Sequence, residues 1–212
     1  MAWKSGRHLM KLYDNQRAPN PRRVRIFLAE KEMTVPSVQV DLLAREQKSE
    51  DFRRKNSLGS IPVLELDDGE CIAESVAICR YLEELQPEPA LFGRDARERA
   101  RVEMWNRRLE LGLLVPVGQV WIHGSPHTAK LVKQVPAAAE FNRGVITRFL
   151  RWLDGELAAS KFVAGERYSV ADITGLCTLD FATALVGISI DPTLSHLSRW
   201  HAAVAGRPSA RA

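Results

Sequence analysis

Glu74 and Ser75 are the residues of this sequence that are best placed to bind a small anion. They stand at the start of residues 75–85, whose apolar spacing predicts a helix. The first turn of a helix presents unpaired backbone N–H groups and the positive end of the helix dipole, so a carboxylate binds there readily. A Glu-Ser pair on its own is more often only a helix cap. The residues that precede the pair favour a binding site.

A proline corner and a hairpin lead into this pair. Pro62 opens the apolar run 63–66, and proline fits into a sheet only at a strand's first residue, an edge or a bulge. A tight corner with a cis Ile61-Pro62 bond is therefore expected. Such a corner leaves the N–H and C=O of Ile61 free to pair with a short extended peptide. The Asp68-Gly69 pair then predicts a hairpin turn that returns the chain to the anion site.

This order of features resembles the glutathione site of the glutathione S-transferases: Asn-x-x-Gly-x-Ile-Pro-x-Leu, then Asp-Gly, then Glu-Ser. In that family the residue before the proline pairs through its backbone with the cysteinyl part of glutathione, and the Glu-Ser pair holds the γ-glutamyl carboxylate. The resemblance gives these roles to Ile61 beside Pro62, and to Glu74 and Ser75. It also places Lys48 near the glycine carboxylate, although an exposed charge before a helix describes this lysine equally well.

The thiol of glutathione needs a donor to become a thiolate, because a free cysteine-type thiol has a pKa of about 8.5. In the family this donor follows the first strand and is a Tyr, Ser or Cys in the best-known classes, whereas here Ala18 stands in its place. Asn20 is the next candidate, as in bacterial members that use asparagine. Two interpretations stay open: the Asn20 amide donates to the sulfur, or it only caps the helix that Asn20-Pro21 begins. Tyr13 is expected in the core, and Arg17 and Arg22 are candidate electrostatic helpers.

The whole order of predicted elements agrees with this resemblance. The fold class is α/β plus all-α: a thioredoxin-like βαβαββα domain over residues 8–85, a linker over 86–93 and an all-helical domain over 94–208. In the first domain we expect strands at 9–13, 35–42, 63–66 and 71–73, and helices at 20–31, 49–56 and 75–85.

The second domain is expected to contain helices only. They cover residues 94–123, with bends near Gly112 and Pro116, then 141–157, a buried helix that begins at Ser169, and 192–205. Ser169 and Asp172 have the spacing of a capping box. The resemblance implies that this domain holds an apolar electrophile against Gly112, Val115 and Pro116, and that the chain forms a homodimer. Met104 and Trp105 are the candidate contacts in the long helix after the linker, and a core position describes Trp105 equally well.

Composition limits the other classes of function. The net charge of +4 comes mainly from arginines, which alternate with glutamates along residues 94–110, so a solvated helix is predicted and a nucleic-acid site is not. Three widely spaced cysteines predict no disulfide framework, and the sequence shows no export signal or membrane span, so a cytoplasmic protein is expected. His123 and His127 are separated by Gly-Ser-Pro and are not expected to bind a metal.

The resemblance covers Leu9 to Arg207 and implies a cytosolic-type glutathione transferase of the bacterial kind, with glutathione as co-substrate, no metal, and a role in detoxification. Two alternatives stay open at this point. One is a glutathione-dependent disulfide reductase, and the other is a non-catalytic partner-binding protein with the same fold. No partner among nucleic acids or membranes is expected.

Overall fold

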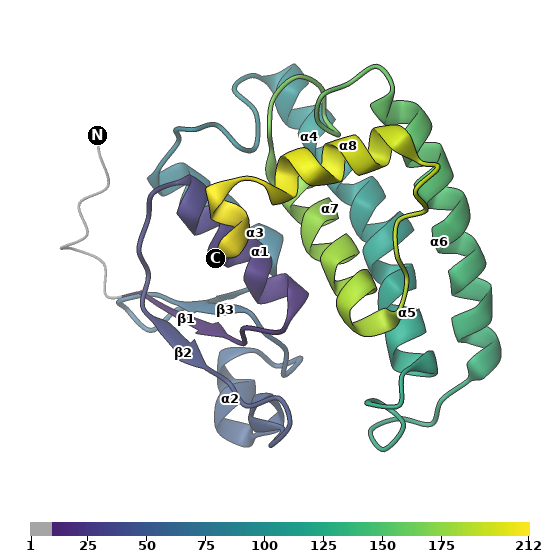
Figure 1. Ribbon diagram of the computed structural model, residues 1–212. Helices are drawn as coiled ribbons and strands as arrows, with labels where there is room; N and C mark the ends of the chain where they lie inside the picture. Colours follow the sequence, from purple (N-terminus) through teal and green to yellow (C-terminus); the bar gives the residue numbers. More distant parts are fainter. Residues whose placement is uncertain (1–9) are drawn as a thin grey trace. The chain divides into compact units, whose positions relative to one another are not determined.

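The computed structural model describes residues 10–212, which form two compact units (Figure 1). The first unit contains the described residues up to Leu91 together with Pro208–Ala212, and the second contains Phe92–Arg207. The first unit is mixed α/β, and the second is built from helices. The expected fold class is confirmed by this content and by the element order.

The first unit has a four-stranded mixed sheet in the order β2-β1-β3-β4. β1 is parallel to β2 and antiparallel to β3, and β3 forms a hairpin with β4. Figure 1 shows α1 and α3 on one side of the sheet and α2 on the other. The elements of this unit are β1 (Lys11–Asp14), α1 (Pro19–Glu30), β2 (Ser37–Gln39), the 3₁₀ turn η1 (Glu46–Lys48), α2 (Glu50–Lys55), β3 (Val63–Glu65), β4 (Cys71–Ala73), α3 (Ser75–Leu85) and the C-terminal turn η4 (Pro208–Arg211).

The boundaries of two predicted elements in this unit were wrong. The second strand, expected over 35–42, is only Ser37–Gln39, because the Asp41 carboxylate accepts hydrogen bonds from the next backbone N–H groups and turns the chain. The first helix begins at Pro19 with Ala18 as its N-cap, so Asn20 does not cap it. Proline suits the first helical position because its missing N–H is not needed there. Leu9 of the predicted first strand lies outside the described residues.

A buried lysine fixes the segment that follows α3. The Lys31 side chain is fully buried, and its Nζ donates to the carbonyl oxygens of Gln86 and Pro89 at 2.8 and 2.6 Å. The Glu83 carboxylate lies 2.5 Å from the same nitrogen. Burial lowers the pKa of Lys31, and the pairing with Glu83 opposes this shift. The first part of the predicted linker is thereby attached to the end of α1.

The second unit consists of α4 (Ala96–Leu109), the π-helical turn η2 (Glu110–Leu114), α5 (Val115–Gly124), α6 (Pro136–Leu157), α7 (Val170–Phe181), the π-helical turn η3 (Ala182–Val186) and α8 (Ser195–Ala205). The long helical stretch expected over 94–123 runs from α4 through η2 to α5, and Gly112 lies in its π-helical turn. A Cβ at Gly112 would lie 2.3 Å from the Phe149 ring of α6. Only glycine therefore permits this close approach of the two helices.

The capping box predicted at Ser169 and Asp172 is present and joins three parts of the second unit. The fully buried Asp172 carboxylate accepts from the backbone N–H of Ser169 at 2.9 Å, from that of Val163 at 3.0 Å and from the indole N–H of Trp200 at 2.8 Å. Burial raises the pKa of Asp172 to about 6, although these hydrogen bonds favour the charged form. The box thus has a structural role at the centre of this unit.

Candidate functional site

The β3–β4 hairpin brings the predicted anion site and the proline corner to one end of the sheet. Val63 pairs with Ala73, so the residues just before β3 lie beside the residues just after β4. Tyr13, near the end of β1, pairs with Val63, so β1 also ends at this edge. The start of α1, Ile61 and the start of α3 therefore meet at the same edge of one sheet. This edge is the candidate functional site.

α3 begins at Ser75, as the sequence predicted. Glu74 is its N-cap residue, with a φ of 68° and an exposed side chain that forms no capping hydrogen bond. A positive φ is uncommon for a residue other than glycine, and it often marks a functional position. Ser75 is 5% exposed and is the first residue of the helix. The N–H groups of this first turn have no partner within the helix, so they are available to an anion.

A buried arginine that the sequence analysis did not assign lies behind Ser75. Arg23 of α1 is 2% exposed, and its Nη1 donates to the Ser75 hydroxyl oxygen at 3.0 Å. The sequence contained one signal of this burial, because Arg23 precedes Phe27 by four residues and therefore shares the apolar face of α1. Its partner in α3 is 52 residues away and could not be inferred.

The proline corner has the expected form, with a cis Ile61-Pro62 peptide bond. The buried Asn56 side chain shapes the loop before it by donating to the carbonyl oxygen of Ser60 at 2.8 Å and accepting from the N–H of Leu58 at 3.2 Å. Within residues 10–212 the backbone of Ile61 forms no hydrogen bond. Its N–H and C=O are thus available to an extended ligand, as the sequence analysis expected.

Lys48 lies against the same loop. Its Nζ donates to the carbonyl oxygen of Leu58 at 3.1 Å, and its side chain passes close to Gly59, where a Cβ would lie 3.1 Å from the lysine Cδ. Gly59 has a φ of +56°, which favours glycine at this crowded position. The structure therefore brings Lys48 to the loop that ends at Ile61, with its charge at the surface.

Asn20 is the second residue of α1 and is half-buried. Its side chain forms no hydrogen bond to any residue between 10 and 212, so the capping interpretation is excluded for it. Hydrogen bonds fix the loop before Asn20. Arg25 donates to the Asp14 carboxylate and to the carbonyl oxygen of Gln16. The Asn15 amide also donates to the carbonyl oxygen of Val40 at 3.0 Å. A fixed loop thus leads into the N-terminus of α1, where the Asn20 side-chain amide has no hydrogen-bond partner among residues 10–212.

The side chain of Tyr13 forms its contacts with Glu65 and Phe52 and not with the candidate site. Its hydroxyl donates to the Glu65 carboxylate at 2.7 Å, and its ring packs edge-on against Phe52, with the centroids 5.7 Å apart. Lys11 and Lys55 pair with the same carboxylate at 2.8 and 2.6 Å and, with the tyrosine, lower the pKa of Glu65 to about 2. Tyr13 is thus a packing residue, as predicted.

The two candidate helper arginines differ. Arg17 is exposed, and its backbone N–H donates to the Asn15 side chain at 3.1 Å. The Arg22 guanidinium donates to the carbonyl oxygen of Ala210 at 3.0 Å and so holds the C-terminal turn against α1. Arg22 is therefore engaged in a structural contact.

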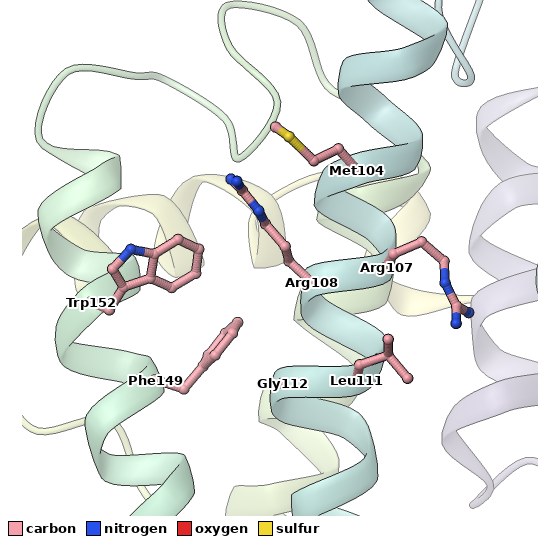
Figure 2. Close-up of a pocket in the computed structure, with 7 residues that line it drawn as sticks. All are labelled: Met104, Arg107, Arg108, Leu111, Gly112, Phe149 and Trp152. Atoms are coloured by element: carbon pink, nitrogen blue, oxygen red, sulfur yellow. The ribbon is translucent and has the colours of Figure 1, made fainter.

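The second unit contains an open pocket of about 500 Å³ between the α4–η2 segment and α6 (Figure 2). Its lining is mostly apolar and carries two arginines: Met104, Arg107, Arg108, Leu111, Gly112, Phe149 and Trp152. Of the residues expected to hold the electrophile, Gly112 lines this pocket, Val115 is 50% exposed and Pro116 is buried.

Trp105 and Met104, both expected at a dimer interface, differ in accessibility. Trp105 is 7% exposed, and its ring stacks on Trp152 at a centroid distance of 5.5 Å. The Arg108 guanidinium lies 5.0 Å from the centre of the Trp105 ring. Met104 is 40% exposed at the pocket. Trp105 is therefore a core residue, while Met104 is accessible to a partner.

Residues 10–212 contain no group of three or more His, Cys, Asp or Glu side chains arranged to hold a metal ion. His123 and His127 are used separately: His123 accepts from the N–H of Val135 at 3.4 Å, and His127 stacks on Trp121. In the same part of the chain, no helix combines the length and apolar character that crossing a membrane requires.

Two family signatures match the chain, and they are described as "Glutathione S-transferase, N-terminal domain" over residues 9–84 and "Glutathione S-transferase, C-terminal domain" over residues 122–208. The glutathione S-transferase 2 of Saccharomyces cerevisiae is 37% identical over 206 residues, which are 95% of this chain and 88% of that protein.

Solved structures agree with these matches. A glutathione S-transferase domain-containing protein from Marinobacter aquaeolei is 41% identical, with a TM-score of 0.88 over 94% of this chain and 98% of that one. A Gtt2-class glutathione S-transferase from Vibrio parahaemolyticus is 36% identical, with a TM-score of 0.83 over 94% of each chain. Sequence and fold thus agree, and the chain belongs to the glutathione S-transferase family.

Proposed function

We propose that this glutathione transferase joins the thiolate of glutathione to an apolar electrophile at the sheet edge formed by α1, the proline corner and α3. Ile61 pairs with the peptide backbone of glutathione, Glu74 and Ser75 bind its γ-glutamyl end, and Lys48 binds its glycine carboxylate. The convergence of these elements on one edge, fixed by the register of β1, β3 and β4, is the observation that carries the proposal.

Asn20 is assigned the chemical step. Its amide N–H donates to the sulfur, and the N-terminus of α1 adds positive potential, so the thiol loses its proton to solvent more readily. The thiolate then attacks the electrophilic carbon, a carbon–sulfur bond forms, and the leaving group departs with the displaced electron pair. The absence of a capping role within the described residues supports this assignment, because the amide is available.

The experiment for this function compares two reactions. We expect the protein to conjugate glutathione with a chlorinated nitroaromatic acceptor in a steady-state assay. Turnover of hydroxyethyl disulfide without conjugation would instead identify a disulfide reductase. Retention on immobilised glutathione with neither activity would indicate a binding protein, and no retention would exclude the proposed site.

The second unit is proposed to supply the electrophile site, with Val115 and Gly112 in contact and the buried Pro116 beneath them. Val115 is half-exposed and lies about one turn after Gly112. Val115→Trp should shift the preference from larger to smaller acceptors while the KM for glutathione stays the same. Unchanged selectivity would move the electrophile site elsewhere.

A homodimer is proposed to form through the accessible apolar surface of α4 and η2. Met104 and Leu111 are 40% and 59% exposed beside two arginines, and aromatic residues, Met and Arg are enriched at interfaces. We expect sedimentation at twice the chain mass of 23.8 kDa, and a monomer for Leu111→Glu. Leu131→Glu, which changes another exposed leucine of this unit, is the matched control. A wild-type monomer at micromolar concentration would contradict the proposal.

We also propose that the protein acts in the cytoplasm and that conjugation serves detoxification. All three cysteines carry free thiols, and two of them, Cys79 and Cys177, are buried, which fits a reducing compartment. Cell fractionation with an antibody against the native protein tests the location.

A further inference from the structure

Arg23 has no role in the function described above, yet it is a buried charge in contact with the candidate site. We infer that Arg23 is a positioning residue, which orients the Ser75 hydroxyl so that its proton is donated to the γ-glutamyl carboxylate of glutathione. This inference rests on the proposed function. It assigns to α1 a part in binding glutathione at α3, in addition to the part played by Asn20.

The Ser75 hydroxyl has only one direction left for its proton. A serine hydroxyl has one proton to donate and two lone pairs to accept with, and the Arg23 guanidinium can only donate. Its Nη1 lies 3.0 Å from the Ser75 oxygen and therefore occupies a lone pair. The proton of Ser75 must then seek another acceptor. None of the residues 10–212 accepts it, although Ser75 is only 5% exposed.

The proton of Ser75 is therefore available to a ligand. A buried donor without an acceptor is unfavourable, so a ligand oxygen that reaches Ser75 gains the whole of this interaction. Glu74 places Ser75 at the start of α3, where the backbone N–H groups also attract an anion. A carboxylate satisfies both kinds of donor. Without Arg23, the Ser75 hydroxyl could direct its proton toward the protein interior, and the proton would then not be available to the ligand carboxylate.

The charge of Arg23 also acts on the ligand. The guanidinium carries a positive charge and lies directly behind the hydroxyl, in a region with little screening by water. It adds a fixed positive potential to that of the α3 N-terminus. The potential favours a carboxylate over a neutral amide at this position. The site should therefore select peptides that carry the free α-carboxylate of a γ-glutamyl residue.

The experiment measures binding by titration for the wild type, Arg23→Gln, Ser75→Ala and the double variant. The probes are glutathione and cysteinylglycine, which lacks the γ-glutamyl residue. We expect Arg23→Gln to weaken glutathione binding about tenfold, but less than threefold when Ser75 is already alanine, because the two residues act as one unit. Binding of cysteinylglycine should change less than twofold. Arg23→Lys keeps the charge and should restore part of the affinity.

The kinetics separate positioning from a general structural role. Arg23→Gln should raise the KM for glutathione about tenfold and leave kcat at saturating glutathione within twofold, since the sulfur is distant from this end of the ligand. Lys31→Gln is the matched control, because Lys31 is a buried cation at the other end of the same helix. It should lower the melting temperature without changing the preference for glutathione over cysteinylglycine.

Equal weakening of both peptides, or additive effects of Arg23→Gln and Ser75→Ala, would overturn the inference. If Arg23→Gln does not fold, Arg23→Lys decides: full wild-type discrimination between the peptides with unchanged affinity supports a role for charge alone and overturns the positioning of Ser75. Failure of the wild type to bind glutathione would refute the proposed function itself, which is a different result from binding that is indifferent to Arg23.

Discussion

Replacing Asn20 by aspartate should change catalysis and stability in opposite directions. Asn20 is the second residue of α1, and the first turn of this helix contains no acidic residue. A carboxylate there interacts favourably with the helix dipole, so the variant should gain about 0.3–1 kcal/mol of stability. Because the wild-type side chain caps nothing, no capping energy is lost.

The same carboxylate should oppose the thiolate. Two unit charges about 4 Å apart interact by about 1 kcal/mol in water and about 4 kcal/mol at an effective dielectric constant of 20. Since 1.36 kcal/mol corresponds to one pKa unit, the pKa of bound glutathione should rise by about one to three units. Asn20→Ala removes only the charge-assisted hydrogen bond, about 1.5–3 kcal/mol, and should raise this pKa by about one to two units.

The assay is the ultraviolet absorbance of the thiolate in the glutathione complex, titrated against pH, together with turnover at neutral pH and thermal unfolding. Ala29→Asp is the matched control, because it adds the same charge at an exposed position nine residues later on the same helix. That position is about 13 Å away along the axis, beyond the Debye length at 0.1 M salt. An Asn20→Asp variant with the wild-type titration and turnover would refute the assignment of Asn20.

Three further outcomes are expected. Ser75→Ala should weaken retention on immobilised glutathione at least several-fold, because a charge-assisted hydrogen bond is worth about 1.5–3 kcal/mol, and unchanged affinity would remove Ser75 from the site. Gly112→Ala should lower the free energy of unfolding by about 1–3 kcal/mol in thermal melts, since its Cβ would overlap the Phe149 ring, and wild-type stability would contradict that packing. Glu65→Gln should destabilise by about 1.5–3 kcal/mol near neutral pH. The pKa of Glu65 is lowered from 4.5 to about 2 in the folded protein. The stability difference between the wild type and Glu65→Gln should therefore be present above pH 4.5 and disappear as the pH falls through about 2. A stability difference that does not depend on pH would argue against the ion pairs.

The parts of the site that lie on α3 and its hairpin were predictable because their signals are local. Asp68-Gly69 sets the turn, Pro62 sets the start of the strand, and the apolar spacing after Glu74 sets the helix. Each signal acts within a few residues of the feature that it determines. The structure accordingly begins α3 at the predicted residue, Ser75.

The start of α1 was less predictable because two neighbouring residue pairs carry the same signal. Both Ala18-Pro19 and Asn20-Pro21 place a proline where the first helical residue can stand, and asparagine is the better cap by propensity. Contacts from elsewhere settle the choice, because the loop before Ala18 is fixed by Arg25. A hydrogen bond from the N–H of Arg22 to the carbonyl oxygen of Ala18 closes the first turn. Tertiary contacts therefore override propensity here.

The arginines of α1 show why the remaining contacts were not readable. Arg22, Arg23 and Arg25 are near neighbours in the sequence, but successive residues of a helix point about 100° apart, so each side chain meets a different part of the first unit. Arg22 binds a carbonyl 188 residues away, Arg23 binds a hydroxyl 52 residues away, and Arg25 binds the end of β1. Periodicity identifies the face of a helix and not the group opposite it. One short run of positive charge thus fixes the C-terminal turn, the hydroxyl at α3 and the loop before Asn20, and two of these three contacts lie at the candidate site.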